Sequence, residues 1–232
     1  SCSSLNQYGC AFRFFYGIVL GRDGGAFQIP LSRAPQRLPE ILSREELARL
    51  FAVARHAKSR TFLVLAYATG LRLSELCTLR PEHIDSAADR MCIRVEQGKG
   101  AKDRLVPIGE RACAWVDKYL RELRPELATS GDDYTLFLDD DGRGFTPERV
   151  GELVKRQLTA AGIEHAGACH LFRVACATHM LENGADIRFT FRNTAASPRK
   201  RGRIYVGILS LGADIQDFDF RQLLLDLLRE RD

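Results

Sequence analysis

The chain has 232 residues, which is enough for one large domain or two small ones. A hydrophobic content of 45% and a charged content of 28% exclude a wholly disordered chain. The 34 basic and 30 acidic residues leave a net charge of +4, which permits nucleic-acid binding without requiring it. No apolar run reaches the ~18–20 residues of a membrane span, and residues 1–13 lack a signal-peptide pattern. We therefore expect a soluble, cytoplasmic protein with no membrane partner.

Seven cysteines are scattered along the chain, and none forms a Cys-x-x-Cys pair. This spacing disfavours a disulfide framework or a structural zinc site and favours buried thiols in a reducing compartment. Cys176-x-x-His179, with Cys169 and His170 nearby, leaves a metal site as the weaker alternative. We expect no metal and no other cofactor.

The first predicted element is a helix over residues 5–20, which carries apolar and aromatic residues on most of its faces. Residues 23–41 are rich in Gly, Pro and Arg, as is typical of an interdomain linker. We therefore divide the chain into a helix within 1–22, a linker at 23–41 and one larger domain at 42–232. Because a single helix ahead of a linker cannot form a domain, we expect an upstream segment to be missing.

The larger domain is predicted to have a mixed α/β fold that is mainly helical. Ser43-Arg44-Glu45-Glu46 forms a capping box that starts the first helix of this domain. Further helices are predicted near 60–68, 73–80, 110–124, 147–161 and 171–183.

A small antiparallel sheet is predicted where residues 91–95 and 104–107 alternate like two strands. Between them, residues 96–103 form a tip rich in glycine and lysine. The tail from Asp214 onward has the pattern of an amphipathic helix.

Three motifs carry residues suited to chemistry. The first is Thr69-Gly70-Leu71-Arg72-Leu73-Ser74-Glu75, the second is the hairpin tip with Lys99, and the third is His170-Leu171-Phe172-Arg173. Each alone has a plain structural explanation: Arg72 paired with Glu75 on a helix surface, a solvated lysine, or a buried histidine.

In this order and at this spacing, the three motifs resemble the catalytic domain of the tyrosine recombinases, the family of phage integrases and Xer-type enzymes. The family pattern is an arginine in a Thr-Gly-Leu-Arg-x-Ser-Glu turn, a lysine in a Gly-Lys-Gly-x-Lys-x-Arg hairpin, and a His-x-x-Arg. The resemblance covers residues 42–188. Residues 5–23 also resemble the last helix of the family's DNA-core-binding domain.

The resemblance implies exchange of DNA phosphodiesters through a 3′-phosphotyrosine, with a role for each matching residue. Arg72 and Arg173 would clamp the nonbridging phosphate oxygens, because guanidinium groups bind bidentately and stay charged. Lys99 would protonate the departing 5′ oxygen. His170 would help to activate the tyrosine, whose pKa of ~10 makes it a poor nucleophile unaided.

The sequence departs from the family pattern at Ala196, where family members carry His or Trp. Tyr205 stands nine residues further on, at the spacing of the nucleophilic tyrosine. Since alanine donates no hydrogen bond to the phosphate, this loss is expected to cost ~10²–10³ in rate. Whether the chain is an active enzyme stays open, and so does the choice between nucleophile and packing residue for Tyr205.

Double-stranded DNA is the partner that the resemblance implies. The basic residues of the hairpin and of the run before Tyr205 are candidate phosphate contacts, with a solvated loop as the alternative for that run: Lys102, Arg104, Arg199, Lys200, Arg201 and Arg203. The amphipathic tail would dock on a neighbouring protomer in a tetramer on DNA, or else pack on its own chain.

The function predicted from the sequence is a site-specific recombinase or integrase of a mobile element. Two alternatives stay open. One is a catalytically inactive DNA-binding remnant, and the other is nicking and resealing of the type IB topoisomerase kind.

Overall fold

The computed structural model of the chain describes residues 2–22, 40–87, 89–96, 103–128, 134–165, 167–186 and 190. The chain divides into two compact units, Ser1–Pro39 and Glu40–Asp232. Several predictions lie outside the described residues: those on Lys99, Lys102, Ala196, the basic run 199–203, Tyr205 and the tail from Asp214. Among the helices in the described ranges, none is long and apolar enough to cross a membrane.

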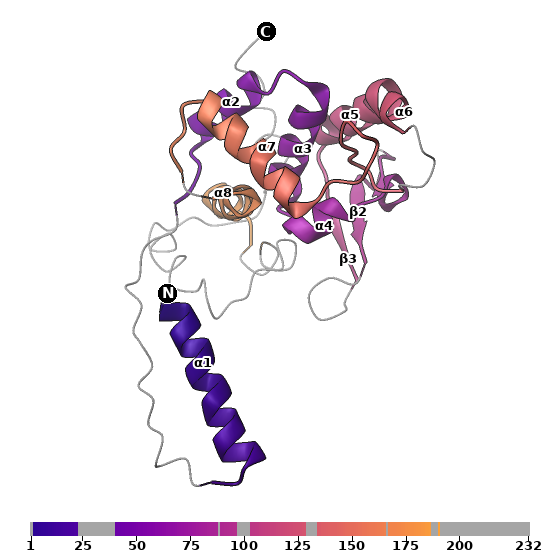
Figure 1. The fold of residues 1–232 in the computed structure, drawn as a ribbon. Coiled ribbons are helices and arrows are strands. Elements are labelled where there is room, and N and C mark those ends of the chain that lie inside the picture. Colours follow the sequence, from indigo (N-terminus) through magenta and orange to yellow (C-terminus); the bar gives the residue numbers. More distant parts are fainter. Residues whose placement is uncertain are drawn as a thin grey trace. The chain divides into compact units, whose positions relative to one another are not determined.

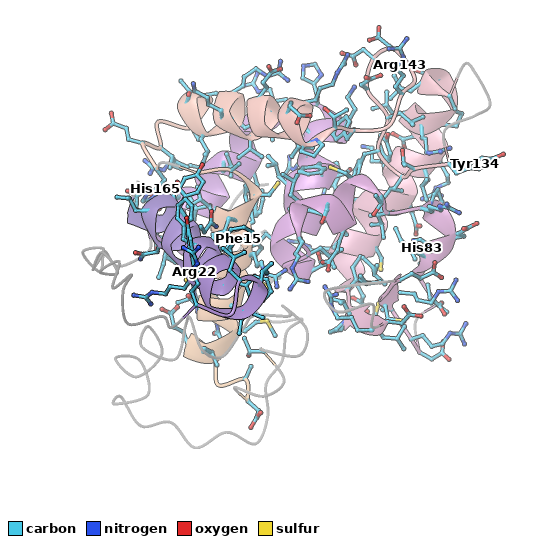
Figure 2. The ribbon with its side chains drawn as sticks, turned by 60° about the horizontal axis from the view of Figure 1, so that its bottom comes forward. Phe15, Arg22, His83, Tyr134, Arg143 and His165 are labelled. Atoms are coloured by element: carbon cyan, nitrogen blue, oxygen red, sulfur yellow. The ribbon has the colours of Figure 1, made fainter. Side chains whose placement is uncertain are left out.

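The first unit contains the helix that the sequence predicts over 5–20. It consists of α1 (Cys2–Phe14), which runs on into one π-helical stretch, η1 (Phe15–Val19). Its large apolar side chains, among them Phe15 near the helix end (Figure 2), are mostly exposed. This helix therefore lacks a core of its own.

The second unit is mainly helical with one small antiparallel sheet (Figure 1), which confirms the predicted fold class. Its helices are α2 (Arg44–Val53), α3 (Ala57–Thr69), α4 (Leu73–Cys77), η3 (Pro81–His83), α5 (Glu110–Lys118), η4 (Tyr119–Leu123), α6 (Arg124–Leu127), α7 (Pro147–Ala160) and α8 (Cys169–Glu182). Its strands are β1 (Ile84–Asp85), β2 (Cys92–Val95) and β3 (Arg104–Pro107).

Two helix starts follow from capping residues visible in the sequence. The Ser43 hydroxyl accepts a hydrogen bond from the Glu46 N–H (3.2 Å), while the Glu46 carboxylate accepts one from the Ser43 N–H (2.8 Å). This reciprocal arrangement is the predicted capping box at the start of α2. At the start of α7, the Thr146 hydroxyl accepts a hydrogen bond from the Arg149 N–H (3.3 Å), and Pro147 occupies the first helical position.

The core is built around α3 and α8. Every residue from Thr61 to Thr69 is buried, as is every residue from Leu171 to Met180. A helix that is buried on all sides belongs in the middle of a domain, and α3 packs against both α5 and α8. These two helices hold the residues around them in fixed positions.

Some predicted boundaries need correction. Helix α4 ends at Cys77 instead of running to residue 80, because Arg80, which precedes Pro81, adopts the extended conformation that a following proline favours. Helix α3 starts at Ala57 instead of near residue 60, and α8 starts at Cys169 instead of residue 171.

The predicted hairpin is present in the sheet, whose strand order is β1-β2-β3. Strands β2 and β3 pair antiparallel, with Val95 opposite Arg104 at the end next to the hairpin tip. Ile93, Val95 and Val106 are buried, as the alternating pattern predicts. The two-residue strand β1 was not predicted, because it is too short to show a period.

Two partly or fully exposed cysteines, Cys10 and Cys92, are free thiols, as are four buried ones: Cys77, Cys113, Cys169 and Cys176. Burial raises the pKa of Cys176 to about 12. These residues therefore act as small apolar side chains of the core, as the sequence predicts.

Candidate functional site

The site begins at the turn that ends α3. Gly70 has a φ of +56°, a left-handed conformation that favours glycine, and its N–H donates to the Ala66 carbonyl (3.1 Å). The Thr69 hydroxyl donates to the Leu65 carbonyl (2.7 Å), which ties the last turn of the helix together. Leu71 is then buried, so the chain leaves the turn in a fixed direction.

Arg72 follows this turn at the start of α4. Its N–H and its Nη1 each donate a hydrogen bond of 2.8 Å to a different carboxylate oxygen of Glu75. The pairing of Arg72 with Glu75 that the sequence offers as a structural explanation is therefore confirmed. About a quarter of the Arg72 side chain (26%) is exposed, so a ligand can reach it.

Arg173 comes to the same turn from α8. Its side chain is buried, and its Nη1 donates to the Gly70 carbonyl (3.0 Å) across 103 residues of sequence. A buried guanidinium needs such partners, because an unpaired charge in the core is costly. The packing of α8 on α3 thus brings Arg173 to the turn from which Arg72 emerges.

His170 lies in the first turn of α8 and is exposed. It precedes Arg173 by three positions, and residues at this spacing neighbour each other on a helix surface. The His-x-x-Arg motif therefore offers one exposed imidazole and one buried guanidinium from the same part of α8.

Arg104, the first residue of β3, completes the cluster. Its Nη1 and Nη2 donate to the two carboxylate oxygens of Glu75 (2.9 and 2.8 Å). The Arg104 and Glu75 side chains are only 11% and 9% exposed. The sequence predicts Arg104 as a DNA contact, whereas in the structure its guanidinium faces Glu75.

Glu75 joins the arginines of this cluster, although the sequence motifs predict it only as a partner of Arg72. Burial raises the pKa of its carboxyl, but the hydrogen bonds and charges of Arg104 and Arg72 outweigh burial and bring the pKa to about 2. The carboxylate is thus ionised at any working pH. Its partner Arg104 stands 29 residues away, so no local pattern could have shown the contact.

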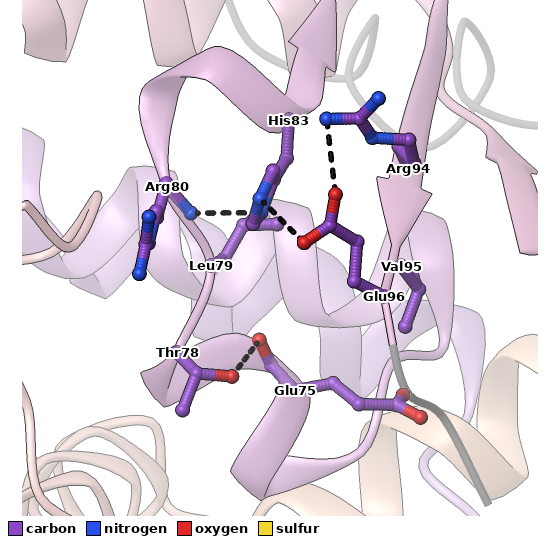
Figure 3. A pocket seen from close by; sticks show the side chains of 8 residues that line it. All are labelled: Glu75, Thr78, Leu79, Arg80, His83, Arg94, Val95 and Glu96. Atoms are coloured by element: carbon purple, nitrogen blue, oxygen red, sulfur yellow. Dashed lines mark hydrogen bonds and ion pairs between the residues drawn. The ribbon is translucent and has the colours of Figure 1, made fainter. Parts of the chain in front are cut away.

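A pocket of about 200 Å³ opens beside this cluster, with Glu75 at one edge and His83 and Arg94 opposite (Figure 3). Glu96 lies between these two, 3.0 Å from Arg94 and 3.7 Å from His83. Since the lining mixes both charges, it favours neither an anion nor a cation.

Two residues of the alternative metal arrangement, Cys176 and His179, have partners inside the core. The Cys176 thiol lies 3.7 Å from the Met180 sulfur, and the Nδ1 of His179 lies 3.0 Å from the Tyr67 hydroxyl. Within the described ranges, no group of three or more His, Cys, Asp and Glu side chains is placed to hold a metal ion.

The described part of the chain thus brings together three of the predicted site residues, Arg72, Arg173 and Arg104, by way of Gly70 and Glu75. It adds His170 on the same helix as Arg173. The remaining candidates lie outside the described residues.

Comparisons with known proteins point in one direction. The family model described as "Phage integrase family" matches residues 40–192. Tyrosine recombinase XerC 2 of Ralstonia nicotianae is 44% identical over 169 residues, which is 70% of this chain and 48% of that protein. The chain spans about half the length of the curated relatives it matches, with 48% and 56% of two of them covered.

Two solved structures share the fold. A structure of XerA recombinase matches with a TM-score of 0.65 and 22% identity, over 100% of this chain and 85% of that one. A structure of XerH recombinase bound to its difH substrate matches with a TM-score of 0.68 and 21% identity, over 91% and 64% of the two chains.

Proposed function

Because this chain belongs to the phage integrase family of tyrosine recombinases, we propose that it breaks and rejoins DNA strands at specific sites, as the recombinase of a mobile element. The observation that carries the proposal is the turn at Gly70. Arg72 leaves this turn, and Arg173 is anchored on its carbonyl from a distant part of the chain. Two arginines fixed at one point suit a phosphate that must be held while its bonds change.

In the proposed mechanism, Arg72 and Arg173 hold the two nonbridging oxygens of the scissile phosphate. Negative charge grows on these oxygens in the transition state, and donors already in place stabilise it without reorganising. The bond from Arg173 to Gly70 supports this role, because it fixes the direction of the guanidinium before DNA arrives.

The strand exchange then has two steps, and in each step one bond to phosphorus forms while another breaks. The Tyr205 oxygen attacks phosphorus while the bond from phosphorus to the 5′ oxygen breaks, with His170 helping to remove the tyrosine proton and Lys99 protonating the 5′ oxygen. This leaves a 3′-phosphotyrosine and a free 5′-hydroxyl. In the reverse step, a 5′-hydroxyl from another strand attacks the phosphotyrosine and releases the tyrosine. One phosphoester replaces another, so no ATP is needed.

The partner we propose is double-stranded DNA. The resemblance to the family and the name of the XerH complex, which describes that protein as bound to difH substrate, support this partner. We further propose that Lys102 and the basic run 199–203 contact DNA phosphates, and that the tail from Asp214 joins protomers into a tetramer on DNA. Such an enzyme would work in the cytoplasm of a bacterial host.

Ala196 stands where family members carry His or Trp, so the test of the proposed function includes this position. We propose a test for a covalent adduct between the chain and DNA. The chain is incubated with nicked duplexes made from the DNA that flanks its own gene, and adducts are separated on denaturing gels. Tyr205→Phe and Ala196→His variants are treated in parallel.

The adduct assay, together with measurements of DNA binding and of supercoil relaxation, separates the candidate functions. An adduct that disappears in Tyr205→Phe supports a working strand transferase, and an adduct formed only by Ala196→His identifies a site impaired at that position. DNA binding without any adduct would favour the inactive remnant. Relaxation of supercoiled DNA without exchange between two duplexes would favour the topoisomerase-like activity.

A further inference from the structure

We propose that Arg104 is a positioning residue of the strand-transfer site, and that it is not a DNA contact. It holds Glu75 and thereby sets the net charge around Arg72 and the direction of the Arg72 side chain. The inference rests on the proposed function, because it assigns Arg104 a part in that reaction. It starts from one observation: Glu75 receives both Arg72 and Arg104 on the same pair of carboxylate oxygens.

The geometry of Arg104 is unsuited to a phosphate contact. Its guanidinium, 11% exposed, makes a two-pronged ion pair with the charged Glu75, whereas the more deeply buried Arg173 donates to the neutral Gly70 carbonyl. Two of the five N–H groups of Arg104 are held by Glu75 in charge-assisted hydrogen bonds, which are among the stronger polar contacts in proteins and fix the direction of the guanidinium. Arg94 on the neighbouring strand β2 is 56% exposed by comparison.

The charge balance gives this ion pair a consequence for Arg72. Arg72, Glu75 and Arg104 together carry a net charge of about +1, since guanidinium groups stay protonated and the pKa of Glu75 lies at about 2. Without Arg104, the Glu75 carboxylate would cancel the charge of Arg72. An arriving phosphate would then compete with that carboxylate for the same guanidinium.

The position of Arg104 in the fold adds a mechanical consequence. Arg104 is the first residue of β3 and lies opposite Val95 of β2, while Glu75 belongs to the short helix that Arg72 starts. The ion pair therefore ties the sheet to the turn that carries Arg72. A four-residue strand and a five-residue helix have little stability of their own, so this link orders both.

The test compares Arg104→Gln, Arg104→Lys and the matched control Arg94→Gln, which removes a guanidinium from the same hairpin, in the full chain. DNA affinity is measured against salt concentration. Adduct formation on the nicked duplex is followed at saturating DNA from pH 5 to pH 9.

We expect Arg104→Gln to keep the salt dependence of DNA binding and to lose on the order of a hundredfold in cleavage rate. A rate loss of this size is typical when a catalytic group is displaced by about 1 Å. The cleavage rate of this variant should also change with pH at the acid end of the range, where the rate of the wild type stays constant. Burial raises the pKa of Glu75, and Arg104 is the main group that lowers it. Without Arg104 this pKa rises, so acid protonates Glu75 and breaks its ion pair with Arg72. Arg104→Lys should restore the flat profile and part of the rate.

Arg94→Gln controls for the other groups near Glu75. His83 and Glu96 line the same pocket and are present in every variant, so a pH effect that arises from them would appear in the control as well. We expect this control to keep the cleavage rate and the pH profile of the wild type.

Two results would overturn the inference. One is unchanged cleavage by Arg104→Gln together with a salt slope reduced by about one, the behaviour of a phosphate contact. The other is an unchanged NMR signal of the Arg72 Nε–H group, assigned with Arg72→Lys, when Arg104 is replaced by Gln. The NMR result does not need activity, so it separates failure of this inference from failure of the proposed function.

Discussion

His179 allows the packing of α8 to be tested through pH. This histidine is 4% exposed, and its Nδ1 lies 3.0 Å from the Tyr67 hydroxyl of α3. Burial, followed by the charge of Arg44, lowers its pKa to about 4, and Glu45 only partly opposes them. An unfolded histidine has a pKa of about 6.5.

The sign of the effect follows from these two pKa values. Above pH 6.5 the imidazole is neutral in both states, so its contribution to stability is complete. Between about pH 6.5 and pH 4, only the unfolded chain binds the proton, and folding stability falls as the pH falls. The interval between the two pKa values corresponds to roughly 3 kcal/mol, a large part of the ~5–15 kcal/mol that stabilises a typical domain.

The assay is urea unfolding of the wild type and of His179→Asn at pH 7.5 and pH 4.5. Asparagine offers an amide near the position of Nδ1, so it keeps a hydrogen-bond partner for Tyr67 but does not titrate. We expect the wild type to lose roughly 2.5 kcal/mol more than the variant between the two pH values. His56→Asn, at an exposed position, should behave as the wild type. Equal losses in the wild type and in His179→Asn would refute the reasoning.

Three further outcomes are expected. Arg173→Lys should keep the fold and lower adduct formation by about 10²–10³, because lysine cannot donate two parallel hydrogen bonds to a phosphate. A near-normal rate on the nicked duplex would show that Arg173 does not hold the scissile phosphate. DNA affinity should fall steeply on a plot of log affinity against log salt, since phosphate contacts release counterions, and a flat plot would count against DNA binding. Ser43→Ala should cost about 1 kcal/mol in urea unfolding through loss of the α2 cap, whereas no change would mean that the cap contributes nothing to stability.

The helices of the second unit could largely be predicted because their signals are local. Ser43 and Glu46 sit at capping spacing, Pro147 follows Thr146, and Gly70 stops α3 at a positive φ. Each of these features acts within one helical turn, so neighbouring residues are enough to reveal it. The boundary of α4 was predicted less well, since a five-residue helix offers little period to detect.

The sequence by itself determined that the chain folds into a mainly helical domain with one small sheet. It also predicts Arg72, His170 and Arg173 as site residues, through motifs whose order and spacing resemble those of the tyrosine recombinases. Only the tertiary structure decided how these residues meet. The contact of Arg173 with Gly70 spans 103 residues, and that of Arg104 with Glu75 spans 29. Such contacts depend on how helices and strands pack, which no local pattern encodes. The ion pair of Arg104 with Glu75, on which our proposal for Arg104 rests, has the same cause: the burial of a charge and its partner are properties of the folded chain.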